Sequence, residues 1–306
     1  YRYYDTLKFK NGNPRPQVSF EEMMANMQKM YSELSLETDE FSQFMLDNKL
    51  LDLKTRKGKY TGGYLTAIAK HALPFILANF DGTEFDFMVL THEMGHAFQY
   101  YQTRKNGINQ AEYLFASMDA SEIHSIGMEL FTWKWYPLFF KDNTRKFQFS
   151  KISAQISTIL SCCSNEVFQQ YLYLNPHHSH EDRNQKWLDV NKQYFPHTNS
   201  EAYFGDSDYL PKGCDWQDSS HIINSPFYMI DYALATVCAL QFWMKAQEDW
   251  QGAWEDYLRL CNVGGTRSFT ELLQLANLKS PFEESTLKEV SDFLKDWLDG
   301  VEDGEF

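Results

Sequence analysis

Residues 85–104 constrain the fold of this chain more than any other segment. Phe87, Leu90, Met94 and Phe98 recur at helical spacing, and the segment contains no proline. The opposite face is also rich in apolar residues, so the helix is apolar nearly all round and is expected to be buried. The same segment carries two histidines and a glutamate. Unpaired polar groups are costly in a protein interior, and a metal ion would satisfy all three.

The run His92-Glu93-Met94-Gly95-His96 has the H-E-x-x-H spacing. On a helix, residues i and i+4 lie about 40° apart around the axis and one turn apart along it. Both imidazoles can then reach one Zn²⁺ at about 2.0–2.1 Å. Glu93 lies beside the pair, where its carboxylate is placed as a general base and not as a ligand. The alternative is that both histidines are ordinary core residues.

A catalytic zinc site needs a third protein ligand. Glu122, on the next predicted helix and 26 residues after His96, could complete a His₂Glu site that keeps a fourth position open. Glu129 lies on the same helical face and is expected to hold a histidine N–H or the water network of the site. Two alternatives stay open: Glu122 and Asp119 could cap the helix, and Glu129 could be an ordinary buried or surface residue. His124 points to another face and is expected at the surface.

Three segments, taken in order, carry a family resemblance. Residues 92–98 followed by residues 122–129 resemble the oligoendopeptidase F branch of the thimet-oligopeptidase-like zinc metallopeptidases. A third match is His221 followed by the run Pro226-Phe227-Tyr228. The resemblance implies a mainly α, gluzincin-like metallopeptidase catalytic domain, with a small β-sheet beside the active-site helix. It also implies that the first glutamate of the second segment is the third zinc ligand.

The resemblance further implies which residues surround the cleft. In the family a histidine and tyrosines face the metal, which corresponds here to His221, Tyr228 and Tyr232. The two tyrosines are also i and i+4, so both hydroxyls could point at one cavity and donate to a developing oxyanion. Spacing does not choose between the two tyrosines, and all three residues could instead be loop and core residues. The resemblance also places Gly62, Gly63, Tyr64 and Asn79 at the strand edge beside the active site, and so implies that they bind the substrate.

The chain also departs from the family pattern. Family members are usually nearly twice this long and have a helical N-terminal region, whereas this chain resembles only the catalytic, C-terminal part. Residues 1–306 are therefore interpreted as a single metallopeptidase catalytic domain that lacks the N-terminal helical region of the family. Ile230 stands where relatives often carry an aromatic residue.

The rest of the chain reads as helices around one small sheet. Strands are expected at residues 64–68 and 73–80, followed by the hairpin-type dipeptide Asp81-Gly82. Helices are expected at residues 21–34, 39–50, 85–104, 119–135, 151–174 and 228–246, a polar turn at 176–183, and a long loop at 198–220.

Charge and cysteine content exclude several classes of protein. With 28 Lys+Arg against 42 Asp+Glu, the net charge of −14 argues against binding to nucleic acid or to anionic membrane surfaces. The longest mostly apolar run, residues 229–244, is too short to span a membrane. Five cysteines without C-x-x-C spacing, and no recognisable signal peptide, indicate free thiols and a cytoplasmic location.

Together the motifs predict a zinc-dependent endopeptidase that binds one Zn²⁺ per chain and cuts internal bonds of short peptides. Two alternatives remain. A carboxypeptidase with the same zinc chemistry would need a cationic group for the substrate carboxylate, and nothing in the sequence singles one out. The second alternative is an inactive peptide-binding fragment, which keeps the metal but lacks the N-terminal wall of the cleft. The oligomeric state is not determined by these patterns.

Overall fold

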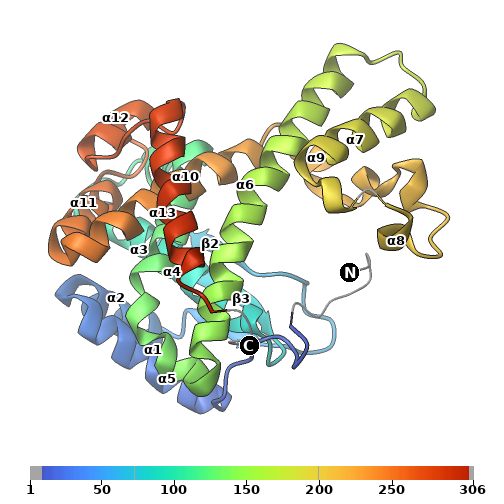
Figure 1. The fold of residues 1–306 in the computed structure, drawn as a ribbon. Coiled ribbons are helices and arrows are strands. Elements are labelled where there is room, and N and C mark those ends of the chain that lie inside the picture. The colour runs from blue at the N-terminus through green and yellow to red at the C-terminus, as the bar shows by residue number, and fades with distance from the viewer. Residues whose placement is uncertain (1–8, 72, 199, 303–306) are drawn as a thin grey trace. The chain divides into compact units, whose positions relative to one another are not determined.

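The computed structural model describes residues 9–71, 73–198 and 200–302, and most of them are helical (Figure 1). This confirms the predicted mainly α fold with a small sheet. Most of the predicted helices begin and end close to the expected positions, because their apolar spacing and caps are local features of the sequence. The helix expected at residues 151–174 is longer than predicted and begins at Thr144. The helices are α1 (Phe20–Leu34), α2 (Leu36–Asp47), α3 (Glu84–Lys105), α4 (Met118–Phe131), α5 (Tyr136–Phe140), α6 (Thr144–Leu174), α7 (His180–Tyr194), α8 (Glu201–Phe204), α9 (Ser220–Asn224), α10 (Met229–Glu248), α11 (Trp250–Val263), α12 (Phe269–Leu275) and α13 (Glu284–Asp299).

The described sheet has three strands in the order β1-β3-β2, with β1 (Leu51–Lys54), β2 (Tyr64–Ile68) and β3 (Leu73–Phe80). The central strand β3 is parallel to β1 and antiparallel to β2, so the buried Ile76 pairs with Leu51 on one side and with Leu65 on the other. Strands β2 and β3 lie where the sequence predicted them. Strand β1 was not predicted. The helix expected at residues 39–50 already ends at Asp47, and Lys49, with a φ of 53°, turns the chain into the strand.

The dipeptide Asp81-Gly82 does not form a hairpin. It links β3 directly to α3, and Gly82 adopts the left-handed region with φ 86°. The Asp86 carboxylate accepts the backbone N–H of Asp81 at 3.0 Å and of Gly82 at 2.8 Å. These bonds fix the start of the helix that carries the H-E-x-x-H motif.

Helices α3 and α4 approach each other closely at Gly95. A Cβ atom at this position would lie 2.6 Å from the carbonyl oxygen of His124 and 2.7 Å from the Cα of Ser125. Only a residue without a side chain lets the two helix backbones come this close. Tyr257 of α11 donates its hydroxyl to the same His124 carbonyl at 2.6 Å.

The described residues form two compact units, and the division falls within α6 and α10. The larger comprises residues 13–152 and 235–302, and its core includes Phe87, whose ring packs against the rings of Phe139, Phe140 and Phe147. The smaller comprises residues 9–12 and 153–234. The single-domain assignment of residues 1–306 stays a prediction.

The smaller unit has its own core and more helix than the sequence predicted. The core is formed by Phe168, Trp187, Trp216 and Ile222. Helix α7 begins inside the expected polar turn, because Ser179 caps it and exchanges hydrogen bonds with Asp182. The expected long loop at residues 198–220 contains α8 and short 3₁₀ turns.

Candidate metal centre

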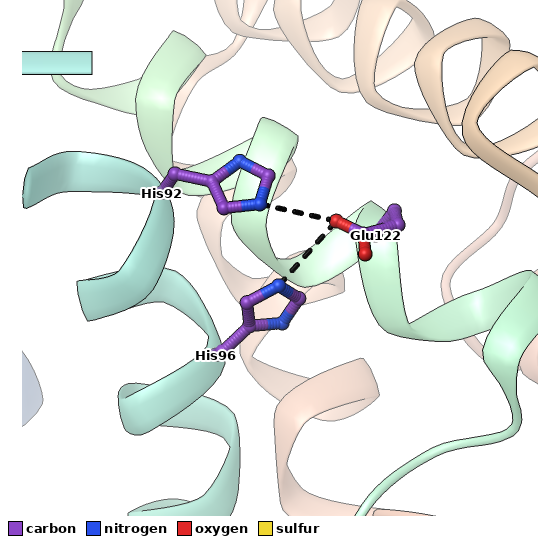
Figure 2. A group of neighbouring side chains, drawn as sticks. All are labelled: His92, His96 and Glu122. Atoms are coloured by element: carbon purple, nitrogen blue, oxygen red, sulfur yellow. Dashed lines mark ion pairs between the residues drawn. The ribbon is translucent and has the colours of Figure 1, made fainter. Parts of the chain in front are cut away.

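His92 and His96 of α3 and Glu122 of α4 bring three ligand atoms together (Figure 2). Oε2 of Glu122 lies 3.2 Å from Nε2 of His92 and 3.4 Å from Nε2 of His96. One ligand atom from each residue lies within 4.8 Å of the other two. The histidine side chains are 24% and 14% exposed, whereas Glu122 is 4% exposed, so the group is anchored in the interior and reached from solvent along the imidazoles.

The position of Glu122 excludes the helix-capping role that the sequence left open. Ser117 occupies the N-cap position of α4 and the helix begins at Met118, so Glu122 lies a full turn inside the helix and does not cap it. Its carboxylate accepts a hydrogen bond from the Ser125 hydroxyl at 2.8 Å while it faces the two histidines. Ser125 therefore helps to hold the carboxylate in the orientation that faces α3.

The charges of this group fit a divalent cation. Burial favours the neutral form of Glu122, but its hydrogen bonds with His92 and His96 outweigh burial and hold the pKa of the carboxyl well below its usual range. Burial likewise opposes a charge on His92, yet the Glu122 and Glu129 carboxylates raise the pKa of His92 to about 10. The site thus stabilises positive charge at the point where the ligand atoms converge. Two imidazoles and one carboxylate are also a known catalytic zinc donor set.

Glu93 lies beside this group and also contacts the sheet. It is 7% exposed, and burial raises the pKa of its carboxyl, while His92 and His96 act in the opposite direction. The backbone N–H of Leu65 in β2 also favours its charged form. The sequence did not indicate Leu65, because the contact joins α3 to a strand whose pairing is not local.

Glu129 is not one of the three converging residues, but it contacts His92, which is. Its Oε1 lies 2.9 Å from Nδ1 of His92, and its Oε2 accepts a hydrogen bond from the ammonium of Lys151 on α6. Burial opposes the charge on Glu129, but Lys151 and His92 lower the pKa of its carboxyl. Sequence reasoning missed Lys151. The available signal was its position four residues after Phe147, on the apolar face of a helix.

His124 is fully buried, which corrects the expectation that it lies at the surface. Its Nδ1–H points at the carbonyl oxygen of Ser121 at 3.3 Å, and burial, followed by the charge of His96, lowers its pKa to about 4. The residue is enclosed because α4 is covered on more than one side, by α3 and by α11.

His221, Tyr228 and Tyr232 form one cluster in the smaller unit. Their ring centroids lie 6.1 Å apart for His221 and Tyr228, 6.3 Å for His221 and Tyr232, and 5.1 Å for the two tyrosines. His221 lies in the short helix α9 and not in a loop, and all three side chains are half-buried. The structure thus brings these three predicted residues together with each other.

All four predicted substrate-binding residues have structural contacts of their own. The Asn79 amide donates to the carbonyl oxygens of Tyr60 at 2.8 Å and Gly62 at 2.9 Å, which fastens the segment before β2. Gly62 has φ 90°, and a Cβ at Gly63 would lie 2.5 Å from the Val89 side chain of α3. Tyr64 opens β2, which is an edge strand of the described sheet, and is 39% exposed. A role in substrate binding stays a prediction for all four.

Within the described part of the chain, no helix is both long enough and apolar enough to cross a membrane.

Comparison with known proteins places the chain in a family. The sequence profile of peptidase family M3 matches residues 9–292. An oligoendopeptidase F homolog of Borreliella burgdorferi is 27% identical over 73% of this chain, and the oligopeptidase PepF of Bacillus subtilis is 22% identical over 85%. The solved structure of PZ peptidase A with an inhibitor superimposes on 98% of this chain with a TM-score of 0.92 and 42% identity, and the match covers 53% of that protein.

The matches to the two curated relatives cover 37% and 38% of their lengths, so the chain spans well under half of each. The resemblance to oligoendopeptidase F is confirmed by the family profile and by these relatives. The profile covers nearly the whole chain. The chain belongs to peptidase family M3.

Proposed function

We propose that this chain forms the catalytic centre of a zinc-dependent endopeptidase that hydrolyses internal bonds of short peptides. The observation that carries the proposal is the convergence of His92 Nε2, His96 Nε2 and Glu122 Oε2, with the Glu93 carboxylate beside them. His92, His96 and Glu122 would hold one Zn²⁺ per chain and leave a further position for water or substrate. When bound, the metal supplies Lewis acidity to the scissile carbonyl and lowers the pKa of a bound water toward about 7.

Glu93 moves the proton in this proposal. Its carboxylate lies near the histidine pair and the backbone N–H of Leu65 in β2, and it is not one of the three residues whose ligand atoms converge, which suits a base better than a ligand. It would take the proton of the attacking water and deliver it to the leaving amine. Burial raises the pKa of Glu93, which strengthens it as a proton acceptor near neutral pH.

Strand β2 and the aromatic cluster supply the substrate side of the proposal. The edge of β2 offers backbone groups to which an extended peptide can add as a further strand. Gly62, Gly63, Tyr64 and Asn79 shape the approach to that edge. A tyrosine hydroxyl of the His221, Tyr228 and Tyr232 cluster would donate to the oxygen that gains negative charge during attack.

The test uses a short internally quenched peptide that is blocked at both ends. An endopeptidase cleaves it, whereas a carboxypeptidase and an inactive binding fragment leave it intact. Cleavage that requires zinc, disappears on chelation and returns when zinc is restored supports the proposal. Release of C-terminal residues from an unblocked peptide, without cleavage of the blocked one, would identify the carboxypeptidase alternative.

We further propose that short peptides are the partners of the chain, that nucleic acid and membranes are not, and that it works in the cytoplasm. The net charge of −14 supports the first part, because anionic polymers and surfaces would repel it. All five cysteines are free, which is typical of a reducing compartment. Localisation of a tagged copy by microscopy or cell fractionation tests the second part.

A further inference from the structure

Lys151 is a lysine whose ammonium lies in the protein interior. Its side chain is 2% exposed, and its Nζ donates to Oε2 of Glu129. Lys59 is enclosed to a similar degree, with 1% of its side chain exposed, and it donates to the backbone carbonyl oxygens of Asp52 and Ala78 and to the Asp52 carboxylate at 3.1 Å. Lys59 therefore fastens the sheet, whereas Lys151 meets a carboxylate that itself touches the candidate metal centre.

Glu129 uses its two oxygens for two different partners. Oε1 lies 2.9 Å from Nδ1 of His92, and Oε2 accepts from Lys151. Because a carboxylate oxygen accepts, the proton on the His92 ring lies on Nδ1 when the ring is neutral. In that tautomer Nε2 carries the lone pair that a metal ion needs, at the point where the ligand atoms converge.

The lysine determines whether Glu129 can keep this position. Glu129 is 4% exposed, so without Lys151 its Oε2 would be an acceptor in the interior without that donor. A carboxylate in that situation turns toward another donor or toward solvent, and either movement releases the His92 ring. Helix α6 is itself held at this place, because the neighbouring Ser150 donates its hydroxyl to the Glu84 carboxylate at 3.0 Å.

We propose that Lys151 is a positioning residue for the metal centre: it holds Glu129, and Glu129 orients the His92 ring so that Nε2 faces the metal. The proposal rests on the metal site of the proposed function and goes beyond it, because no motif of the sequence includes Lys151. A ligand whose orientation is supported in this way usually binds its metal 10- to 100-fold more tightly than an unsupported one.

The experiment measures the zinc dissociation constant of the whole chain by competition with a chelating indicator, and needs no peptide substrate. Lys151→Met is expected to weaken zinc binding about 10- to 100-fold, and Glu129→Gln to weaken it by a similar factor. The double variant should be no weaker than the worse single variant, because both changes remove the same support. Lys59→Met is the matched control, since it removes an equally buried ammonium that touches no metal ligand; its zinc affinity should equal that of the wild type.

Unchanged zinc affinity in a folded Lys151→Met variant overturns the proposal, as does an equal loss in Lys59→Met. If Lys151→Met does not fold, Lys151→Gln replaces it, because its neutral amide can still donate. That variant should bind zinc several-fold more weakly, and wild-type affinity in it overturns the proposal as well. A wild-type chain that binds no zinc refutes the proposed function itself, which separates the two failures.

Discussion

A Cβ atom at Gly95 would lie 2.6 Å from the carbonyl oxygen of His124, closer than a real Cβ approaches an oxygen. The contact joins the helix that carries both histidines to the helix that carries Glu122. The distance between Glu122 and the histidines therefore depends on Gly95, which has no side chain and takes no part in metal binding or catalysis.

Gly95→Ala should separate the two helices. The added methyl must push α4 away, because backbone atoms of His124 and Ser125 occupy its place. We expect a loss of about 1–3 kcal/mol in the free energy of unfolding, as for other overpacked sites, together with weaker zinc binding. Urea unfolding and a zinc titration measure the two effects. Gly300→Ala, at the end of α13, is the control and should change neither appreciably; a Gly95→Ala variant with wild-type zinc affinity would contradict the account of the helix contact.

Glu93→Gln should keep the metal and lose turnover. Glutamine has nearly the same shape but cannot accept a proton at neutral pH, so kcat should fall by several orders of magnitude. Zinc content, measured by elemental analysis, should stay at about one equivalent. More than about a tenth of the wild-type activity remaining in this variant means that Glu93 is not the general base.

Zinc should stabilise the folded chain through Glu122. A ligand that binds only the folded state adds about 2.7 kcal/mol at a free concentration 100 times its dissociation constant, so the melting temperature should rise with zinc and fall on chelation. Glu122→Gln should lose most of this rise. Glu289→Gln makes the same chemical change on an exposed side chain of α13 and should keep the full rise. Equal shifts in both variants would show that zinc binds elsewhere.

One of Tyr228 and Tyr232 should act on the transition state. Phenylalanine keeps the ring and removes only the hydroxyl, so the variant of the donating tyrosine should lose about 100-fold or more in kcat with little change in KM. The other tyrosine variant should be milder, and His221→Ala should fall between them. Melting curves exclude misfolding as the cause. Normal kcat in both phenylalanine variants, singly and combined, leaves the oxyanion role without support.

The ion pair of Asp52 should make stability depend on pH in the acid range. The pKa of Asp52 is lowered from 3.8 to about 2 in the folded chain, mainly because Arg56 donates hydrogen bonds to its carboxylate at 2.7 and 2.8 Å. Burial opposes this shift, and Lys59 adds to it. A lowered folded-state pKa stabilises the fold above the unfolded-state pKa, and the stabilisation is lost as the pH falls from about 4 to about 2. Asp52→Asn should therefore cost about 1 kcal/mol at pH 7 and nothing near pH 2, as measured by urea unfolding. A cost that is the same at both pH values would contradict this.

The sequence by itself determined the features that depend on neighbours along the chain. The i and i+4 spacing of His92 and His96 places both rings on one side of any helix that contains them, whatever surrounds it. Strands β2 and β3 lie at the predicted residues, because Gly62-Gly63 before β2 and Asp81-Gly82 after β3 are local signals that bound them. The family motifs are also short runs, so they could be recognised without knowledge of the fold.

The tertiary structure alone decided which side chains meet across elements. Strand β1 exists because Leu51 pairs with Ile76, and a parallel partner that distant leaves no periodic signal in four residues. Lys151 meets Glu129, and His124 is enclosed, because of how α6, α3 and α11 pack on α4. The spacing of residues along a helix specifies its faces, but the partner of each face depends on helix packing. That packing depends on contacts such as the one at Gly95, which no window of the sequence contains.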